Sequence, residues 1–308
     1  MIQNSLHNSL MSKPFLIADG APGPWLAARF PKLTLPVETL NLSQGETVTQ
    51  LHRAFLQAGA RLVRTNTRGA CRPVLARGGM GDRVESMNVM GAGLLRELTL
   101  NGPFAGSTAM GSLGQISRPA ETLSQTELEK GYSEQIIYLS DSQVNILLLE
   151  HFTRLEEALM ALKLAASASD APVLVGLTLG PDGLTEDGVP PAQAAARLAA
   201  AGAGAVGVSC LPPGERLTRA VEQMAPALEQ AGIPLAVLAA GHSAGSPLTP
   251  QAWLDGLEPL LAFSPAIVGG CCGVGPEHIQ ALASRHPSAE PPRVEEPAPP
   301  PPVSKPPA

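Results

Sequence analysis

Two adjacent cysteines, Cys271 and Cys272, lie in a Gly-Gly-Cys-Cys-Gly run near the end of the chain. They follow an apolar segment, 266–268, and a third cysteine, Cys210, ends another apolar segment, 205–209. A disulfide between adjacent cysteines would strain the peptide that joins them, so we do not expect that bond. Three thiolates at the ends of two strands suit a zinc ion whose fourth position is left for a substrate. The sequence therefore indicates a Zn²⁺ site.

The alternative for each cysteine is a buried thiol without a chemical role, because free cysteine is among the most buried residue types. We favour that interpretation for Cys71, which has no partner nearby in the sequence, and for Cys210 if it is taken alone. Core packing gives no reason for Cys271 and Cys272 both to be sulfur, because they point to opposite sides of a strand end. The glycines beside them allow the backbone and a ligand to approach closely.

The composition argues against several classes of protein. The chain has 308 residues, of which 44% are hydrophobic and 16% charged, enough for a large core. A net charge of -6 without a Lys/Arg cluster argues against nucleic-acid binding. Four cysteines do not form the disulfide framework of a secreted protein, and residues 1–13 lack the apolar run of a signal peptide. The apolar stretches are too short to cross a membrane, so we expect a cytoplasmic protein.

Short apolar runs alternate with Ala- and Leu-rich helical patterns along most of the chain. The eight runs that we expect to be strands are 15–19, 61–66, 103–107, 144–150, 173–178, 205–210, 234–239 and 266–270. The expected helices are 47–58, 123–141, 154–168, 191–201, 215–230 and 250–260, with a loop plus helix over 72–100. Apolar strands separated by helices are typical of a parallel sheet buried on both faces, and eight such units predict an α/β fold, the (β/α)8 TIM barrel.

An open doubly wound sheet is the alternative fold, and it normally carries a glycine-rich phosphate loop after its first strand. Here the Gly-Ala-Pro-Gly-Pro run over 20–24 follows the first strand, and we expect it to be too proline-rich to open a helix around a pyrophosphate. We therefore predict a flexible or disordered N-terminus over 1–13, a barrel over 14–288 and a disordered Pro-rich tail over 289–308.

Catalytic residues of such barrels lie at the C-terminal ends of the strands, where they meet at one mouth. The polar residues expected there are Asp19, Asn66, Glu150, Thr178, Cys210, Cys271 and Cys272. For Asp19 the alternative is a turn residue before Gly20, and for Glu150 it is a carboxylate that stabilises the start of the next helix.

The order of these motifs resembles the homocysteine S-methyltransferase domain family, which includes betaine–homocysteine methyltransferases and the homocysteine domain of methionine synthase. The resemblance runs through most of residues 15–286, and its most specific part is the Gly-Gly-Cys-Cys-Gly run. The other matching parts are Asp-Gly-Ala at 19–21, Thr-Asn-Thr at 65–67, Gly-Ser-Leu-Gly at 111–114, Glu150, and Gly-Val-Ser-Cys at 207–210.

The resemblance implies an enzyme, a zinc-dependent methyltransferase of the EC 2.1.1 type, in which Cys210, Cys271 and Cys272 bind Zn²⁺. The metal would deprotonate the thiol of homocysteine, whose sulfur then attacks an activated methyl group and gives methionine. No catalytic residue beyond the zinc site is implied. Asp19 and Glu150 match the positions that hold the amino group of homocysteine, where charge-assisted bonds to an ammonium are physically sound. The remaining substrate-binding candidates are the backbone at Gly20 and Ser112, for the carboxylate, and Asn66.

The chain departs from the family pattern at Arg64, where a Glu is common, and after Ala21, where Pro-Gly-Pro-Trp replaces Met-Gly-Thr. The methyl donor therefore stays open among S-methylmethionine, a betaine-like onium compound and a methyl-carrying protein. An onium donor favours an aromatic cage, for which Trp25 is the best candidate. The alternatives to an enzyme are a zinc- or thiol-binding barrel, or subunit, that has lost methyl transfer, and a redox sensor with vicinal thiols. His151 and His242 are weaker candidates for the site.

Overall fold

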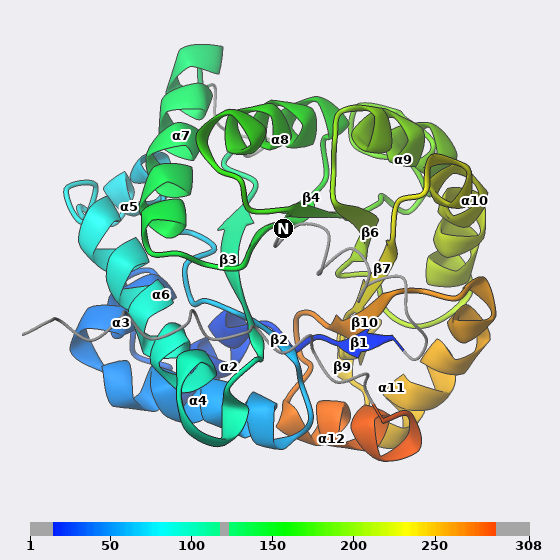
Figure 1. Ribbon diagram of the computed structural model, residues 1–308, viewed down its shortest axis with the longest axis horizontal. Helices are drawn as coiled ribbons and strands as arrows, with labels where there is room; N and C mark the ends of the chain where they lie inside the picture. The colour runs from blue at the N-terminus through cyan, green and yellow to red at the C-terminus, as the bar shows by residue number, and fades with distance from the viewer. Residues whose placement is uncertain (1–14, 118–122, 288–308) are drawn as a thin grey trace, which may run out of the picture.

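The computed structural model describes residues 15–117 and 123–287. Its main sheet contains eight parallel strands: β1 (Leu16–Ile17), β2 (Leu62–Arg64), β3 (Thr108–Gly114), β4 (Ile146–Phe152), β5 (Val173–Leu177), β6 (Ala205–Ser209), β7 (Leu235–Ala239) and β10 (Ile267–Gly270). They are hydrogen-bonded in the order β1-β10-β7-β6-β5-β4-β3-β2, and a parallel bridge between Ala18 and Leu62 joins β1 to β2. The sheet therefore closes on itself (Figure 1), and the (β/α)8 barrel is confirmed.

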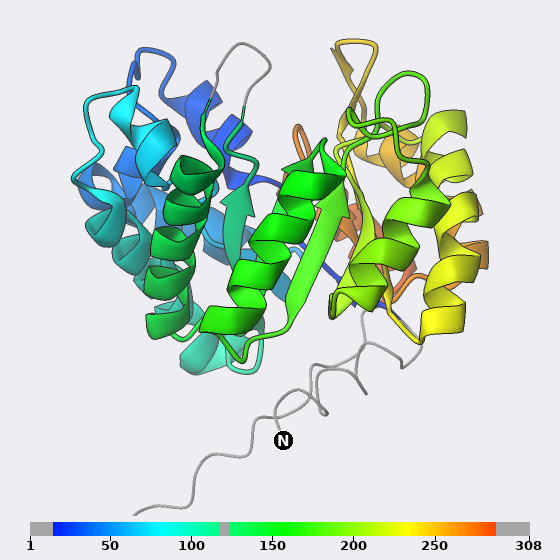
Figure 2. The same cartoon turned by 90° about the horizontal axis from the view of Figure 1, so that it is seen from above.

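The helices surround the sheet (Figures 1 and 2). They are α2 (Pro22–Arg29), α3 (Leu40–Ser43), α4 (Gly45–Gln57), α5 (Arg72–Ala76), α6 (Val84–Leu100), α7 (Gln125–Asp141), α8 (Leu155–Ala168), α9 (Pro191–Ala200), α10 (Glu215–Ala231), α11 (Pro250–Leu257) and α12 (Pro276–Arg285). Three 3-10 helices, η1 (Val37–Thr39), η2 (Gly102–Phe104) and η3 (Glu258–Phe263), and a small hairpin of β8 (His242–Ser243) and β9 (Ser246–Pro247) complete the fold. No helix in the described ranges has the length and apolarity to cross a membrane.

The alternation of side chains along the strands creates two apolar layers. Leu62, Met110 and Leu148 point inward and fill the barrel, whereas Val63 and Leu147 point outward and pack under the helices. Because side chains alternate along each strand, Arg64, Ser112 and Glu150 also lie on the inward face of β2, β3 and β4, next to the apolar layer inside the barrel. The strand pattern thus brings three polar side chains to the barrel interior.

The third strand was predicted in the wrong place. Residues 103–107 overlap η2 and a turn, and β3 instead runs from Thr108 to Gly114. Its sequence, Thr-Ala-Met-Gly-Ser-Leu-Gly, is rich in small residues, and Thr108 is its one β-branched residue. Ser112 and its neighbours at 111–114 therefore lie within a strand, not in a loop after one.

The proline-rich stretch after β1 was also misjudged, because α2 begins at Pro22. Proline is well suited to the first turn of a helix, where its missing N–H would have no intrahelical partner. The expected helices over 47–58, 123–141, 154–168, 191–201 and 215–230 correspond to α4, α7, α8, α9 and α10, and the one over 250–260 is α11 followed by η3. The predicted N-terminal segment, the Pro-rich tail and both predicted barrel boundaries lie outside the described residues.

Candidate functional site

The three cysteines meet at the C-terminal end of the barrel. Cys210 follows β6, and Cys271 and Cys272 follow β10. The Sγ atom of Cys210 lies 2.7 Å from that of Cys271 and 3.2 Å from that of Cys272, and the last two are 4.0 Å apart. Among the described residues they form the single group of three or more potential metal-ligating side chains, with ligand atoms within 4.8 Å of one another.

This donor set fits a zinc ion. Two sulfurs bonded to one tetrahedral Zn²⁺ at about 2.3 Å are about 3.8 Å apart. The 4.0 Å between Cys271 and Cys272 is close to this value, whereas Cys210 lies nearer to both sulfurs and would move outward around the ion. Three soft thiolates without an oxygen ligand favour zinc over magnesium or calcium. Three protein ligands also leave the fourth position of a tetrahedral site open, which is the pattern of a catalytic site.

The two cysteine loops are fixed by backbone contacts with neighbouring strands. The Cys210 amide donates to Leu238 O, and the Cys271 amide donates to Ala239 O. Gly20 makes this packing possible, because a Cβ there would lie 2.1 Å from Val274 O in the loop after Cys272. Cys210 has a φ of 60°, a left-handed conformation that is uncommon outside glycine and clusters at functional sites.

The sulfurs share their protons. Hydrogen bonds from Cys210 and Cys271 lower the pKa of Cys272, and the positive charge of Arg68 lowers it further. Hydrogen bonding to Cys210 and Cys272, together with burial, raises the pKa of Cys271. Binding of a divalent metal would release the thiol protons.

A cavity of about 310 Å³ opens beside the cysteines and is mainly apolar. Its walls include Cys271, Cys272, Glu150, His151, Arg68 and the residues that begin α2. A polar hollow of about 260 Å³ adjoins it and shares Arg68 and His151. Arg68 is exposed and therefore lies at the rim of the cavity. The cysteine cluster thus borders a cavity that carries a cation at its entrance.

Asp19 and Glu150 both pair with Arg64 inside the barrel. Arg64 Nε lies 2.9 Å from Asp19 Oδ1, and Nη1 lies 2.6 Å from Glu150 Oε2. The guanidinium also donates to the carbonyls of Asp19 and Gly270 through Nη2. All three side chains are at most 2% exposed.

The charges of this triad are strongly coupled. Burial lowers the pKa of Arg64, but the charges of Glu150 and Asp19 raise it by more, so the guanidinium stays protonated. Burial raises the pKa of Asp19 to about 7, although Arg64 opposes the rise. A single buried guanidinium thus faces two carboxylates.

His151 lies on a bulge of β4, where the register shifts between Leu149 and Phe152. Its φ is 64°, and its backbone amide donates to Ser209 Oγ. Its Nδ1 atom lies 3.3 Å from Thr178 Oγ1, which donates to Ser209 O. Burial lowers the pKa of His151, so the imidazole that faces the cavity is neutral near pH 7.

The other predicted residues occupy supporting positions. Asn66 borders the cavity, but its amide group bonds to Val37 O and Asn41 Oδ1. Ser112 Oγ donates to Glu150 Oε1. His242 Nδ1 lies 3.3 Å from the carbonyl oxygen of Cys272, so it contacts the backbone of the cluster and not its sulfurs. Trp25 packs on the core and under Arg29, and it is not among the cavity residues.

The sequence interpretation assigned no role to Arg64 or Arg68. Arg64 was visible as a departure from the family pattern and as a charged residue in an otherwise apolar strand, which signals a buried partner when the strand is central. Arg68 lies just after the Thr-Asn-Thr run, and nothing in its local pattern distinguishes it from a solvated surface arginine. Only the closed barrel places it beside the cysteines.

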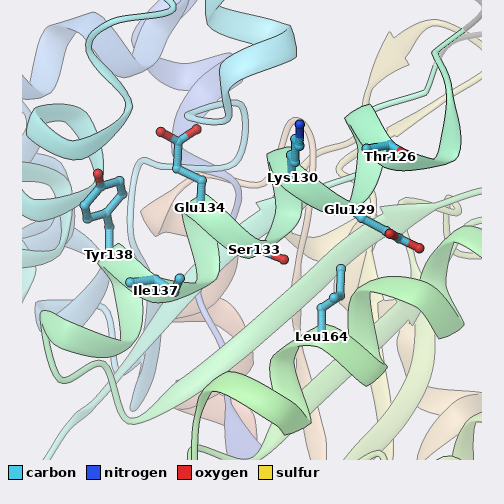
Figure 3. A pocket seen from close by; sticks show the side chains of 8 residues that line it. All are labelled: Thr126, Glu129, Lys130, Ser133, Glu134, Ile137, Tyr138 and Leu164. Atoms are coloured by element: carbon cyan, nitrogen blue, oxygen red, sulfur yellow. The ribbon is translucent and has the colours of Figure 1, made fainter.

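A separate surface hollow is bordered by side chains of α7 and Leu164 of α8 (Figure 3). Glu129, Lys130 and Glu134 lie on α7 around it, and Glu134 pairs with Arg72. It shares no residue with the cavity at the cysteines.

Comparison with known proteins places these residues in context. The sequence model described as homocysteine S-methyltransferase matches residues 16–286. The chain is 30% identical over 269 residues to betaine–homocysteine S-methyltransferase 1 of Bos taurus, a match that covers 77% of this chain and 63% of the relative. It is 28% identical over 265 residues to an S-methylmethionine–homocysteine S-methyltransferase of Pongo abelii, covering 77% and 69%. The chain thus spans less than two thirds of the bovine relative.

Solved structures show the same fold. The metallated form of the homocysteine methyltransferase MmuM from Escherichia coli superimposes with a TM-score of 0.76 at 21% identity, covering 92% of this chain and 100% of that one. A methyltransferase from Methanosarcina mazei superimposes with a TM-score of 0.60 at 12% identity, covering 92% and 97%. At these identities the likeness is one of architecture.

Proposed function

The chain belongs to the homocysteine S-methyltransferase family, and from that premise we propose that it transfers a methyl group to the thiolate of homocysteine to form methionine. The observation that carries this proposal is the convergence of the Cys210, Cys271 and Cys272 sulfurs at one end of the barrel. We propose Zn²⁺ as the cofactor, which the metallated form of the E. coli neighbour supports. The four described cysteines are free, which fits the reducing cytoplasm that we propose as its location.

The transfer needs a thiolate nucleophile and an activated methyl group in line with it. A bound Zn²⁺ would supply the thiolate at neutral pH. The sulfur forms a bond to the methyl carbon while the bond from that carbon to the donor heteroatom breaks, and its electron pair stays on the donor. The thiol proton passes to solvent. The mainly apolar cavity beside Cys271 and Cys272 would hold the two reactants close together.

We propose an onium compound as the methyl donor. The relatives named above use betaine or S-methylmethionine according to their names. Glu150 borders the cavity, and a neutral His151 does not repel a cation. No Phe, Tyr or Trp is among the residues that border this cavity, so carboxylate and apolar contacts would have to replace an aromatic cage.

A second candidate is a zinc- or thiol-binding barrel that has lost methyl transfer. The pairing of Arg64 with both Asp19 and Glu150 favours it, because the carboxylates expected to bind the acceptor amine already have a partner. The two candidates share the metal site and differ in turnover. They are therefore separated by product formation and not by metal content.

The test is methionine formation by zinc-loaded protein supplied with homocysteine and either S-methylmethionine or betaine. We expect product from the wild type and from Cys71→Ala, whose sulfur lies in the core, and none from Cys272→Ser. A wild type that binds zinc and homocysteine but transfers no methyl group from any donor, including a methyl-carrying protein, would support the second candidate.

A further inference from the structure

Arg64 occupies the place that the sequence pattern assigned to the amino group of the substrate. Its guanidinium lies between Asp19 and Glu150 and contacts both. An ammonium could reach the same position only if Arg64 moved away. Arg64 is completely buried and is also held by the carbonyls of Asp19 and Gly270.

Each oxygen of the two carboxylates already accepts a hydrogen bond from the protein. Asp19 Oδ1 accepts from Arg64 Nε, and Oδ2 accepts from the Arg64 backbone amide at 3.0 Å. Glu150 Oε2 accepts from Arg64 Nη1, and Oε1 accepts from Ser112 Oγ. Each carboxylate oxygen of the pair therefore has one donor from the protein, and a substrate amine would have to share these oxygens with the Arg64 guanidinium, which already supplies the positive charge.

Arg64 lies next to the metal-binding residues, so its pairing with the two carboxylates affects how an acceptor thiol can bind. Gly270, whose carbonyl accepts from Arg64, directly precedes Cys271. Glu150 borders the cavity that opens at Cys271 and Cys272. A thiol bound to the cysteine cluster would thus lie near three charged groups that already pair with one another.

We propose that Arg64 makes this site indifferent to an α-ammonium group, so that its acceptors are mercapto-carboxylates in general, with homocysteine as one of them. The inference rests on the proposed function, because it concerns the acceptor of that site. Arg64 acts here as a residue that determines specificity by filling the amine position. The exposed Arg68 at the rim is the cation available to an acceptor carboxylate.

The test compares the affinities of zinc-loaded protein for homocysteine and for 4-mercaptobutyrate, which is homocysteine without its amino group. We expect calorimetric dissociation constants within about fivefold of each other for the wild type, the range of an exposed charge contact. A preference for homocysteine of about tenfold or more, as a charged hydrogen bond would give, overturns the proposal.

Variants at Arg64 make the comparison specific. Arg64→Gln frees both carboxylates, so we expect a preference for homocysteine of about tenfold or more. Arg64→Lys keeps a cation in the triad and should retain the wild-type ratio. The control Arg61→Gln, just before β2, should also retain it, because the Arg61 side chain donates to the neighbouring Ala60 O and not to the triad. A folded Arg64→Gln protein with the wild-type ratio overturns the proposal. If Arg64→Gln does not fold, the wild-type and Arg64→Lys ratios decide.

Binding and turnover separate this inference from the proposed function. Equal binding of both thiols without methyl transfer would leave the inference standing and remove the proposed activity. Methyl transfer to homocysteine together with tenfold weaker binding of 4-mercaptobutyrate would support the proposed function and overturn the inference about Arg64. Failure of zinc-loaded protein to bind either thiol would overturn both.

Discussion

The Nη1 atom of Arg64 lies 2.6 Å from Oε2 of Glu150, although 86 positions separate the two residues in the chain. The contact exists because β2 and β4 both direct alternate side chains into the barrel. Either charge alone would be costly to bury, and the opposite charge offsets part of that cost. The contact therefore joins the stability of the barrel to the chemistry at its mouth.

Loss of Arg64 should destabilise the protein strongly. Arg64→Met leaves Asp19 and Glu150 buried without a counter-charge, for which we expect a loss of about 3–5 kcal/mol in the free energy of unfolding. The matched control is Arg72→Met, which removes a pair with Glu134 at the surface and should cost less than about 1 kcal/mol. Urea denaturation of the three proteins measures both values. Equal losses in the two variants would contradict the buried triad.

Acid should destabilise the protein through His52. This imidazole is buried on α4, neither ring nitrogen has a hydrogen-bond partner in the described part of the chain, and burial lowers its pKa to about 4. Because folding lowers the pKa of His52, the protein has its full free energy of unfolding above the unfolded pKa of about 6.5. As the pH falls from there through the folded pKa of about 4, protonation of the unfolded chain lowers that free energy. The shift corresponds to about 3 kcal/mol.

Unfolding free energies between pH 7 and pH 4 check this expectation. The variant His52→Leu removes the titrating group, so its stability should fall less over the same interval. If the wild type and His52→Leu lose stability in parallel, His52 is not the source of the pH dependence.

A methyl group at Gly20 should disturb the metal site. The new Cβ would lie 2.1 Å from Val274 O, so Gly20→Ala must displace the loop that follows Cys271 and Cys272. We expect a loss of stability of about 1–3 kcal/mol and a weaker affinity for zinc. Gly23→Ala is the control, because its Cβ would meet nothing closer than 3.5 Å. Competition with a chromogenic chelator reports the zinc affinities, and the account requires Gly20→Ala to be the weaker binder.

The barrel could be predicted because most of its strands are apolar on both faces. Runs such as Leu235–Ala239 and Val173–Leu177 show this pattern clearly. The third strand escaped because Thr108–Gly114 includes two glycines, and Gly111 leaves room for Leu139 and Val144 outside the sheet. A strand whose small residues make room for neighbouring side chains lacks the apolar, β-branched pattern by which strands are predicted.

The cysteine cluster could be predicted because Cys210, Cys271 and Cys272 each follow a recognisable strand, and parallel strands end on the same side. The pairing of Asp19 and Glu150 with Arg64 could not be predicted, because it depends on contacts across the barrel. Position 64 showed a departure from the family pattern, but only the closed sheet reveals that its side chain turns inward to both carboxylates. Substrate binding stays a prediction for the five residues assigned to it, Asp19, Glu150, Gly20, Ser112 and Asn66.

The most direct measurement is the zinc content of purified protein under reducing conditions, for the wild type, Cys272→Ser and Cys71→Ala. The account predicts about one zinc per chain in the wild type and in Cys71→Ala, and a large loss in Cys272→Ser. A folded wild type that holds no zinc after loading would contradict the thiolate site and, with it, the proposed methyl transfer.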